Sequence, residues 1–204
     1  VFSPYYFRAR SRGDMAPENH VSLNVVLYGP RYARWCMTER GRHSLVQHPD
    51  QLILGPSHVR ATKHGLIISV EERSVPFMRR VSGQIEVSFG VRVDKCFELD
   101  GRGDHWWWPV SPLGSMNVSF DCPSICWSGN AYVDSNFGAA PIETGFSSWN
   151  WCRGHSTESS CEIHYDTQLT DGGQKRLSIM IDREGSLTPF ASPSLYQLPA
   201  GAIW

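Results

Sequence analysis

CEIHYDTQLTDGGQKRLSIMID, residues 161–182, reads as a β-hairpin and decides the fold class of the chain. Two strand-sized runs, 161–169 and 175–182, bracket Asp171-Gly172-Gly173, and aspartate and glycine are the residues that tight hairpin turns prefer. A further turn signal, Arg183-Glu184-Gly185, follows directly. The C-terminal part of the chain is therefore predicted to be antiparallel β-sheet.

The rest of the chain shows the same organisation. Residues 20–28 (HVSLNVVLY) and 34–38 (RWCMT) flank the turn-like stretch 29–31, which predicts a second hairpin. Residues 66–71, 83–89 and 115–120 alternate in part between apolar and polar side chains, as strands with one buried face do. The pattern predicts an all-β fold with little helix, either a barrel or a sandwich, and a barrel suits the enclosure of one long apolar ligand.

The length of the chain leaves its division into domains open. A chain of 204 residues suits one large all-β domain or two small barrels. Residues 100–104 (DGRGD) are polar and rich in glycine, and they form either a long turn or a boundary between two sheet units within the 1–204 region. The sequence starts at Val1 without a methionine, a charged leader or a signal-peptide core, so we expect it to be part of a longer polypeptide.

Composition excludes several functional classes. Nineteen Lys and Arg against 20 Asp and Glu give a net charge of -1, which provides no field to attract nucleic acid. A mean hydropathy of -0.32 is typical of a soluble globular protein rather than a membrane span. The six cysteines include no Cys-x-x-Cys pair and are expected to be free thiols, and the eight scattered histidines predict no metal site.

Two aromatic segments, 105–109 (HWWWP) and 127–138 (WSGNAYVDSNFG), hold the candidate site. Residues two apart on a strand share a face, so His105 would pair with Trp107 and Tyr132 with Asp134. An acid and a histidine among aromatic rings suit a pocket for an apolar substrate. Composition leaves open the alternative that the tryptophans only pack in the core and that residues 134–136 form a turn. Further candidates for binding substrate in the same cavity are Trp127, Trp149 and Trp151.

Distinctive blocks follow one another along the chain at residues 1–6 (VFSPYY), 17–29 (PENHVSLNVVLYG), 34–42 (RWCMTERGR), 105–112 (HWWWPVSP), 127–138 (WSGNAYVDSNFG), 145–151 (GFSSWNW) and 198–204 (LPAGAIW). With Tyr165-Asp166, they resemble the carotenoid 1,2-hydratase family, or hydroxyneurosporene synthases, of carotenoid-making bacteria. The resemblance covers essentially the whole chain. It departs in a loop at 153–160 and in a third consecutive tryptophan, Trp108.

The resemblance implies a fold, a reaction and a set of residues. The fold would be related to antiparallel lipocalin-like barrels, often described as a tandem pair. The reaction would be a cofactor-free hydration of the C1–C2 double bond of an acyclic carotenoid, such as neurosporene or lycopene, to a 1-hydroxy-1,2-dihydro product. The residues that it marks as catalytic are His105, Trp107, Tyr132 and Asp134.

Hydration of such an alkene begins with a proton at C2, which leaves a tertiary carbocation at C1. Asp134 is the candidate acid, although a free Asp has a pKa of about 3.9, so burial among rings would have to keep part of it protonated. Trp107 and Tyr132 would stabilise the cation, by roughly 2 kcal/mol for each ring. His105 would position the water or take its proton, and Asp134 is the alternative acceptor.

Two other functional classes stay open from the sequence. One is a lipocalin-like carrier that binds a carotenoid or another apolar ligand, and the other is a related barrel isomerase or cyclase. Because the substrate is a bilayer hydrocarbon, we expect a peripheral protein on the cytoplasmic side of the bacterial inner, photosynthetic membrane. Exposed apolar residues at the barrel mouth would make the contact.

Overall fold

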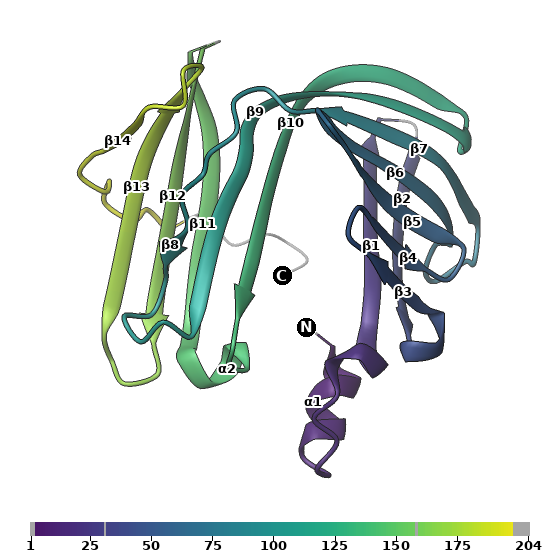
Figure 1. Cartoon of the computed structure of the whole chain (residues 1–204), viewed down its shortest axis with the longest axis horizontal. Coiled ribbons are helices and arrows are strands. Elements are labelled where there is room, and N and C mark those ends of the chain that lie inside the picture. Colours follow the sequence, from purple (N-terminus) through teal and green to yellow (C-terminus); the bar gives the residue numbers. More distant parts are fainter. Residues whose placement is uncertain (1–2, 31, 158, 198–204) are drawn as a thin grey trace. The chain divides into compact units, whose positions relative to one another are not determined.

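The computed structural model describes residues 3–30, 32–157 and 159–197 (Figure 1). These residues are mostly strand, arranged in antiparallel sheets of two, eight and four strands, so the all-β prediction is confirmed. A closed barrel requires the outer strands of a sheet to pair with each other. The described part of the eight-stranded sheet has β10 at one edge and β3 at the other, so the lipocalin-like barrel is not confirmed.

Strands account for most elements of the described ranges, where two short α-helices and two 3-10 turns accompany them. In chain order the elements are α1 (Pro4–Arg10), η1 (Pro17–His20), β1 (Val21–Gly29), β2 (Tyr32–Arg40), η2 (Arg42–Ser44), β3 (Leu45–His48), β4 (Gln51–Leu54), β5 (Ser57–Thr62), β6 (Gly65–Arg73), β7 (Arg80–Ser88), β8 (Phe97–Glu98), β9 (His105–Cys122), β10 (Ile125–Gly138), α2 (Ile142–Gly145), β11 (Phe146–Thr157), β12 (Ser160–Leu169), β13 (Gln174–Asp182) and β14 (Leu187–Pro189).

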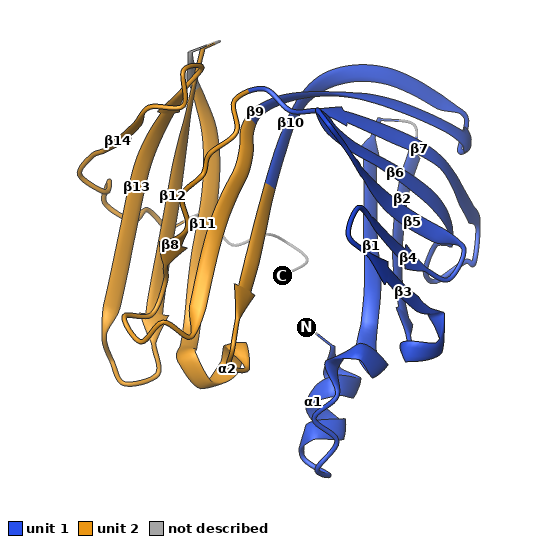
Figure 2. Ribbon diagram, viewed as in Figure 1, with its two compact units in different colours: residues 1–90, 113–133 blue, residues 91–112, 134–204 orange. Residues whose placement is uncertain are grey.

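The chain forms two compact units (Figure 2). Unit 1 comprises residues 1–90 and 113–133, and unit 2 comprises residues 91–112 and 134–204. The long strands β9 and β10 each contribute residues to both units. Residues 100–104 lie within unit 2, in the connection between β8 and β9.

Unit 1 has a core between the β1–β2 hairpin and the larger sheet. The hairpin pairs Val25 with Cys36, as the sequence predicts for this region, although Arg31 of its expected turn lies outside the described residues. Cys36 packs with side chains from β6, β7 and β9, and their burial removes apolar surface from water, which favours folding. The buried members of this cluster are Cys36, Val70, Val81, Val118 and Phe120.

Unit 2 is built on the predicted C-terminal hairpin. Strands β12 and β13 pair from Ser160–Asp182 to Gln168–Gln174, and Gly172 in the turn has a positive φ, which glycine adopts without strain. The 183–185 turn is also present, before β14. One face of this sheet is buried and apolar, because side chains two apart share a face. Its buried residues include Cys161, Ile163, Tyr165, Ile179 and Ile181.

Two local predictions are wrong. Residues 134–136 belong to β10 and do not form a turn, because pairing with β9 outweighs the turn preference of aspartate and asparagine. Most of the expected loop 153–160 is strand: β11 continues to Thr157, and Arg153 pairs with Ile163 of β12. The block 198–204 lies outside the described residues. None of the helices in the described ranges has both the length and the hydropathy to cross a bilayer.

Candidate functional site

Strand β9 places His105 and Trp107 on one buried face. Burial alternates from residue to residue at the start of this strand, as it does when a strand packs one face against a core. His105 is 7% exposed and Trp107 is fully buried. Trp106 and Trp108 alternate with them on the other face of the strand and are half-buried. The prediction that His105 and Trp107 share one face of a strand is therefore confirmed.

A hydrogen bond between an indole and a carboxylate joins β9 to β10. Nε1–H of Trp107 donates to Oδ2 of Asp134 at 2.9 Å, and Asp134 is half-buried. An indole nitrogen is only a donor, so Oδ2 is the accepting oxygen in this pair.

Two aromatic rings hold the indole of Trp107 in place. The ring of Tyr165, from β12, lies 5.6 Å from that of Trp107 at an interplanar angle of 50°. The ring of Phe97, from β8, lies 5.4 Å away at 35°. Tilted pairs at these distances are favourable ring geometries. The hydroxyl of Tyr165 donates to Oδ1 of Asn136 at 3.1 Å, two residues after Asp134 on β10.

The environment of Tyr165 keeps its phenol neutral. Burial, and after it the nearby negative charge of Asp134, raises the pKa of Tyr165 to about 12. Near neutral pH the side chain is therefore a hydrogen-bond donor and a very weak acid.

His105 packs closely against Gly145 at the end of α2 and Phe146 at the start of β11. Its ring is 4.7 Å from that of Phe146, at 45°. A β-carbon built on Gly145 would come within 2.7 Å of Nε2 of His105, so only glycine leaves room for the imidazole. Among the described residues Nε2 has no hydrogen-bond partner, although it is buried. A buried ring nitrogen without a hydrogen-bond partner is an exception that calls for a structural or functional explanation.

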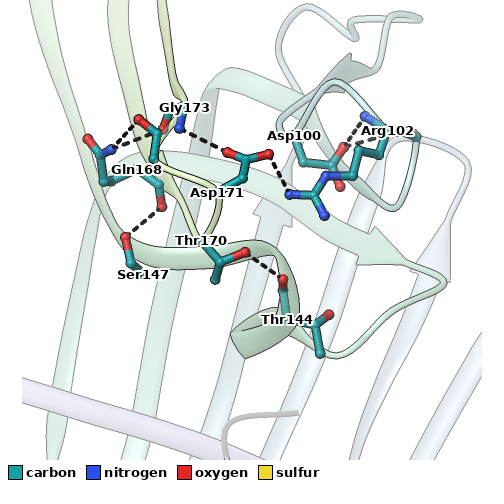
Figure 3. A network of polar contacts seen from close by, with 10 residues as sticks. Asp100, Arg102, Thr144, Ser147, Gln168, Thr170, Asp171 and Gly173 are labelled. Carbon is teal, nitrogen blue, oxygen red and sulfur yellow. Dashed lines mark hydrogen bonds and ion pairs between the residues drawn. The ribbon is translucent and has the colours of Figure 1, made fainter.

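A polar network links the β12–β13 turn to α2 and to the connection that leads into β9 (Figure 3). The backbone N–H of Thr170 donates to the carbonyl oxygen of Gly145 at 3.1 Å. The hydroxyl of Thr170 donates to the carbonyl oxygen of Thr144 at 2.9 Å. On the connection that leads into β9, Arg102 pairs with Asp171 of the β12–β13 turn at 3.0 Å. The turn between β12 and β13 therefore anchors both α2, which ends at Gly145, and the connection that leads to His105.

The predicted tryptophans of β11 share a face with Tyr165. Trp151 pairs directly with Tyr165, and Trp149 pairs with Thr167, so the four side chains project from the same side of the sheet. Trp149 and Trp151 are each 41% exposed. Both tryptophans therefore expose ring surface on the face of the sheet from which Tyr165 packs against Trp107.

Two predicted site residues belong to the other unit. Trp127 and Tyr132 lie on β10 in unit 1, and Trp127 is 43% exposed. Tyr132 precedes Asp134 by two residues, and the boundary between the units falls between them. The association of Tyr132 and Trp127 with the Asp134 site therefore stays a prediction.

Sequence reasoning assigned no site role to three neighbours of the site, Phe97, Tyr165 and Gly145, although Tyr165 and Gly145 belong to segments that carry the family resemblance. Tyr165 belongs to the strand-like run 161–169, but the sequence carries no signal that this strand packs against β9. Gly145 is one of 18 glycines, and only its approach to His105 distinguishes it. The described residues contain no group of three or more His, Cys, Asp or Glu side chains arranged to bind a metal.

Comparison with known proteins relates the whole chain to one family. Residues 1–204 match the family model described as carotenoid hydratase CrtC. An acyclic carotenoid 1,2-hydratase of Thiocapsa roseopersicina is 40% identical over 204 residues, which are 100% of this chain and 50% of the relative. One from Rubrivivax gelatinosus is 37% identical over 206 residues, with the same coverage.

A third relative, the acyclic carotenoid 1,2-hydratase of Cereibacter sphaeroides, is 36% identical over 91% of this chain and 64% of its own length. The chain spans about half the length of the first two relatives that it matches. No solved structure shows a significant match.

Proposed function

Because the chain belongs to the carotenoid hydratase family, we propose that it forms part of an acyclic carotenoid 1,2-hydratase, a cofactor-free hydro-lyase. The reaction adds water across the C1–C2 double bond of a carotenoid such as lycopene or neurosporene. The observation that carries this proposal is the hydrogen bond from Trp107 to Asp134, which fixes one acid within an aromatic environment.

Asp134 starts the reaction by giving its proton to C2, which leaves the positive charge on the tertiary C1. With Oδ2 accepting from Trp107, Oδ1 carries the proton that is transferred. The carboxylate formed then stabilises the cation electrostatically, and this interaction is strong where water is excluded. Water adds to C1 and loses one proton, so the acid is restored when that proton returns to Asp134.

The accessible rings are better placed than Trp107 to face the cation. Trp107 is fully buried, so in this structure it acts through the Asp134 carboxyl that it orients. Trp149 and Trp151 expose ring surface, and each ring face near a desolvated cation contributes roughly 2 kcal/mol. Tyr132 is proposed to contribute in the same way.

His105 is the proposed residue for handling the water. Its Nε2 is buried and has no partner among the described residues, so it can accept a hydrogen bond from a bound water or take its proton. The route from water to Asp134 then runs either directly or through His105. A near-normal kcat for His105→Gln would favour the direct route, and a large loss of kcat would favour the route through His105.

Product mass tests the proposed reaction against its alternatives. The full-length protein is incubated with lycopene, and the extract is analysed by mass spectrometry. A hydratase gives a product heavier by one water. A carotenoid carrier returns unchanged lycopene, and an isomerase or cyclase gives a product of unchanged mass with a different retention time. Either of these results would refute hydration of this substrate.

We propose peripheral contact with the cytoplasmic side of the inner membrane through the turn between β6 and β7. In unit 1 this turn exposes Phe77 and Met78, which are 76% and 56% accessible, beside Val75. Arg73 and Arg79 flank them, and the guanidinium of Arg79 lies 5.7 Å from the ring centre of Phe77. Apolar side chains bordered by arginines suit the surface of an anionic bilayer.

Vesicle sedimentation tests this contact. Full-length protein is expected to bind phosphatidylglycerol-containing vesicles, and the double variant Phe77→Ser/Met78→Ser is expected to bind several-fold less. Tyr196→Ser changes another highly exposed aromatic residue, in unit 2, and serves as the control. Equal sedimentation of all three proteins would rule out this turn as the contact.

A further inference from the structure

We propose that Tyr165 is a positioning residue of the hydration site, which holds Trp107 and β10 in the arrangement that orients the carboxyl of Asp134. This inference rests on the hydratase function proposed above. Tyr165 lies on β12, remote in sequence from both β9 and β10, and is only 8% exposed.

The ring of Tyr165 supports the donor side of the indole–carboxylate hydrogen bond. It packs on the ring of Trp107 at 5.6 Å, and Trp107 in turn donates its N–H to Asp134 at 2.9 Å. A hydrogen bond weakens steeply when its donor tilts away from the acceptor. Because the ring of Tyr165 limits the tilt of the indole, it also limits the positions that the carboxyl group of Asp134 can take while it keeps this hydrogen bond.

The hydroxyl of Tyr165 supports the acceptor side. It donates to Asn136 at 3.1 Å, and Asn136 follows Asp134 by two residues, so the two side chains project from the same face of β10. Tyr165 thus contacts both strands that the Trp107–Asp134 bond joins. One side chain connects β9, β10 and β12 at the site.

A direct catalytic role for Tyr165 fits the structure less well. Its pKa of about 12, raised by burial and then by the charge of Asp134, makes the phenol a far weaker acid than a carboxyl group. Its hydroxyl is already donated to Asn136. The side chain therefore acts through its neighbours, and its removal should affect the rate more than the binding of substrate.

The test uses Tyr165→Phe, which removes only the hydroxyl, in the full-length protein. We expect kcat for lycopene hydration to fall about tenfold with KM little changed, because the loss is one of orientation. Asn136→Ala should give a similar loss. Since both changes break the same hydrogen bond, the double variant should lose no more than either single variant.

Ser178→Ala is the matched control, because it removes a buried hydroxyl that bonds His164 on the opposite face of β12–β13. It should lower the melting temperature about as much as Tyr165→Phe while leaving kcat unchanged. A wild-type kcat in Tyr165→Phe, an equal loss of kcat in Ser178→Ala, or a multiplicative loss in the double variant would overturn the inference.

The indole N–H of Trp107 gives a readout that needs no activity. In protein labelled with ¹⁵N-tryptophan, its resonance is assigned by its absence in Trp107→Phe. Tyr165→Phe should shift this resonance and speed its exchange with solvent, and Ser178→Ala should not. If the wild-type protein forms no hydrated product but the shift appears, the proposed function fails and the positioning role stands. An unshifted resonance overturns the positioning role, whatever the activity.

Discussion

Replacing Gly145 with alanine should displace His105 and slow hydration. The added β-carbon would lie 2.7 Å from Nε2 and 2.8 Å from Cδ2 of His105, whereas ordinary contacts of this kind are about 3.5 Å. The imidazole would therefore have to move by roughly 0.8 Å, and the ring of Phe146 at 4.7 Å restricts its escape. A displacement near 1 Å of a catalytic group can cost about 100-fold in rate.

We expect Gly145→Ala to reduce kcat for lycopene by about 30- to 100-fold and the free energy of unfolding by about 1–3 kcal/mol. Gly154→Ala is the matched control on β11, the strand that directly follows Gly145, because a β-carbon there meets no atom within 4 Å. Turnover and melting temperature are measured on the full-length proteins. If Gly145→Ala retains wild-type turnover, then the position of His105 does not govern the reaction.

Three further predictions concern Asp134, Glu72 and the cysteines. Asp134→Asn should lower hydration by about 10²- to 10⁴-fold, with the melting temperature and carotenoid binding retained, because the amide oxygen can still accept the indole N–H; a near-normal rate would remove Asp134 from the mechanism. Burial opposes ionisation of Glu72, but hydrogen bonds led by Arg40 outweigh it and leave its pKa below the usual 4.5. Its stabilising effect is present above that pH and is lost as the pH falls through the lowered value, so the melting temperature of wild type should decline more steeply below about pH 4.5 than that of Glu72→Gln; parallel pH curves would contradict this. All six thiols should alkylate in denaturant, with activity surviving dithiothreitol, and Cys36 and Cys161 should react slowest in the native protein because burial raises their pKa values; peptide mapping that finds disulfide-linked cysteines would refute the assignment.

Local sequence signals predicted the parts of the fold that depend on neighbouring residues. The 161–182 hairpin follows from Asp171-Gly172-Gly173, and the shared face of His105 and Trp107 follows from strand alternation. The contact of Trp107 with Tyr165 joins strands that are far apart in sequence, and no local pattern encodes which sheets pack together. Turn preferences of residues 134–136 failed for the same reason, since strand pairing overrides them. Closure into a barrel is likewise a property of edge strands and not of any one segment.

The assignment of one oxygen of Asp134 to Trp107 has a stereochemical consequence. With Oδ2 accepting from the indole, every proton delivered from Oδ1 approaches a bound double bond from the same side. In heavy water, C2 would receive deuterium and become a stereogenic CHD carbon. We expect a single configuration at that carbon, visible by NMR of the labelled product, whereas protonation by solvent, or a double bond bound in two orientations, would give both.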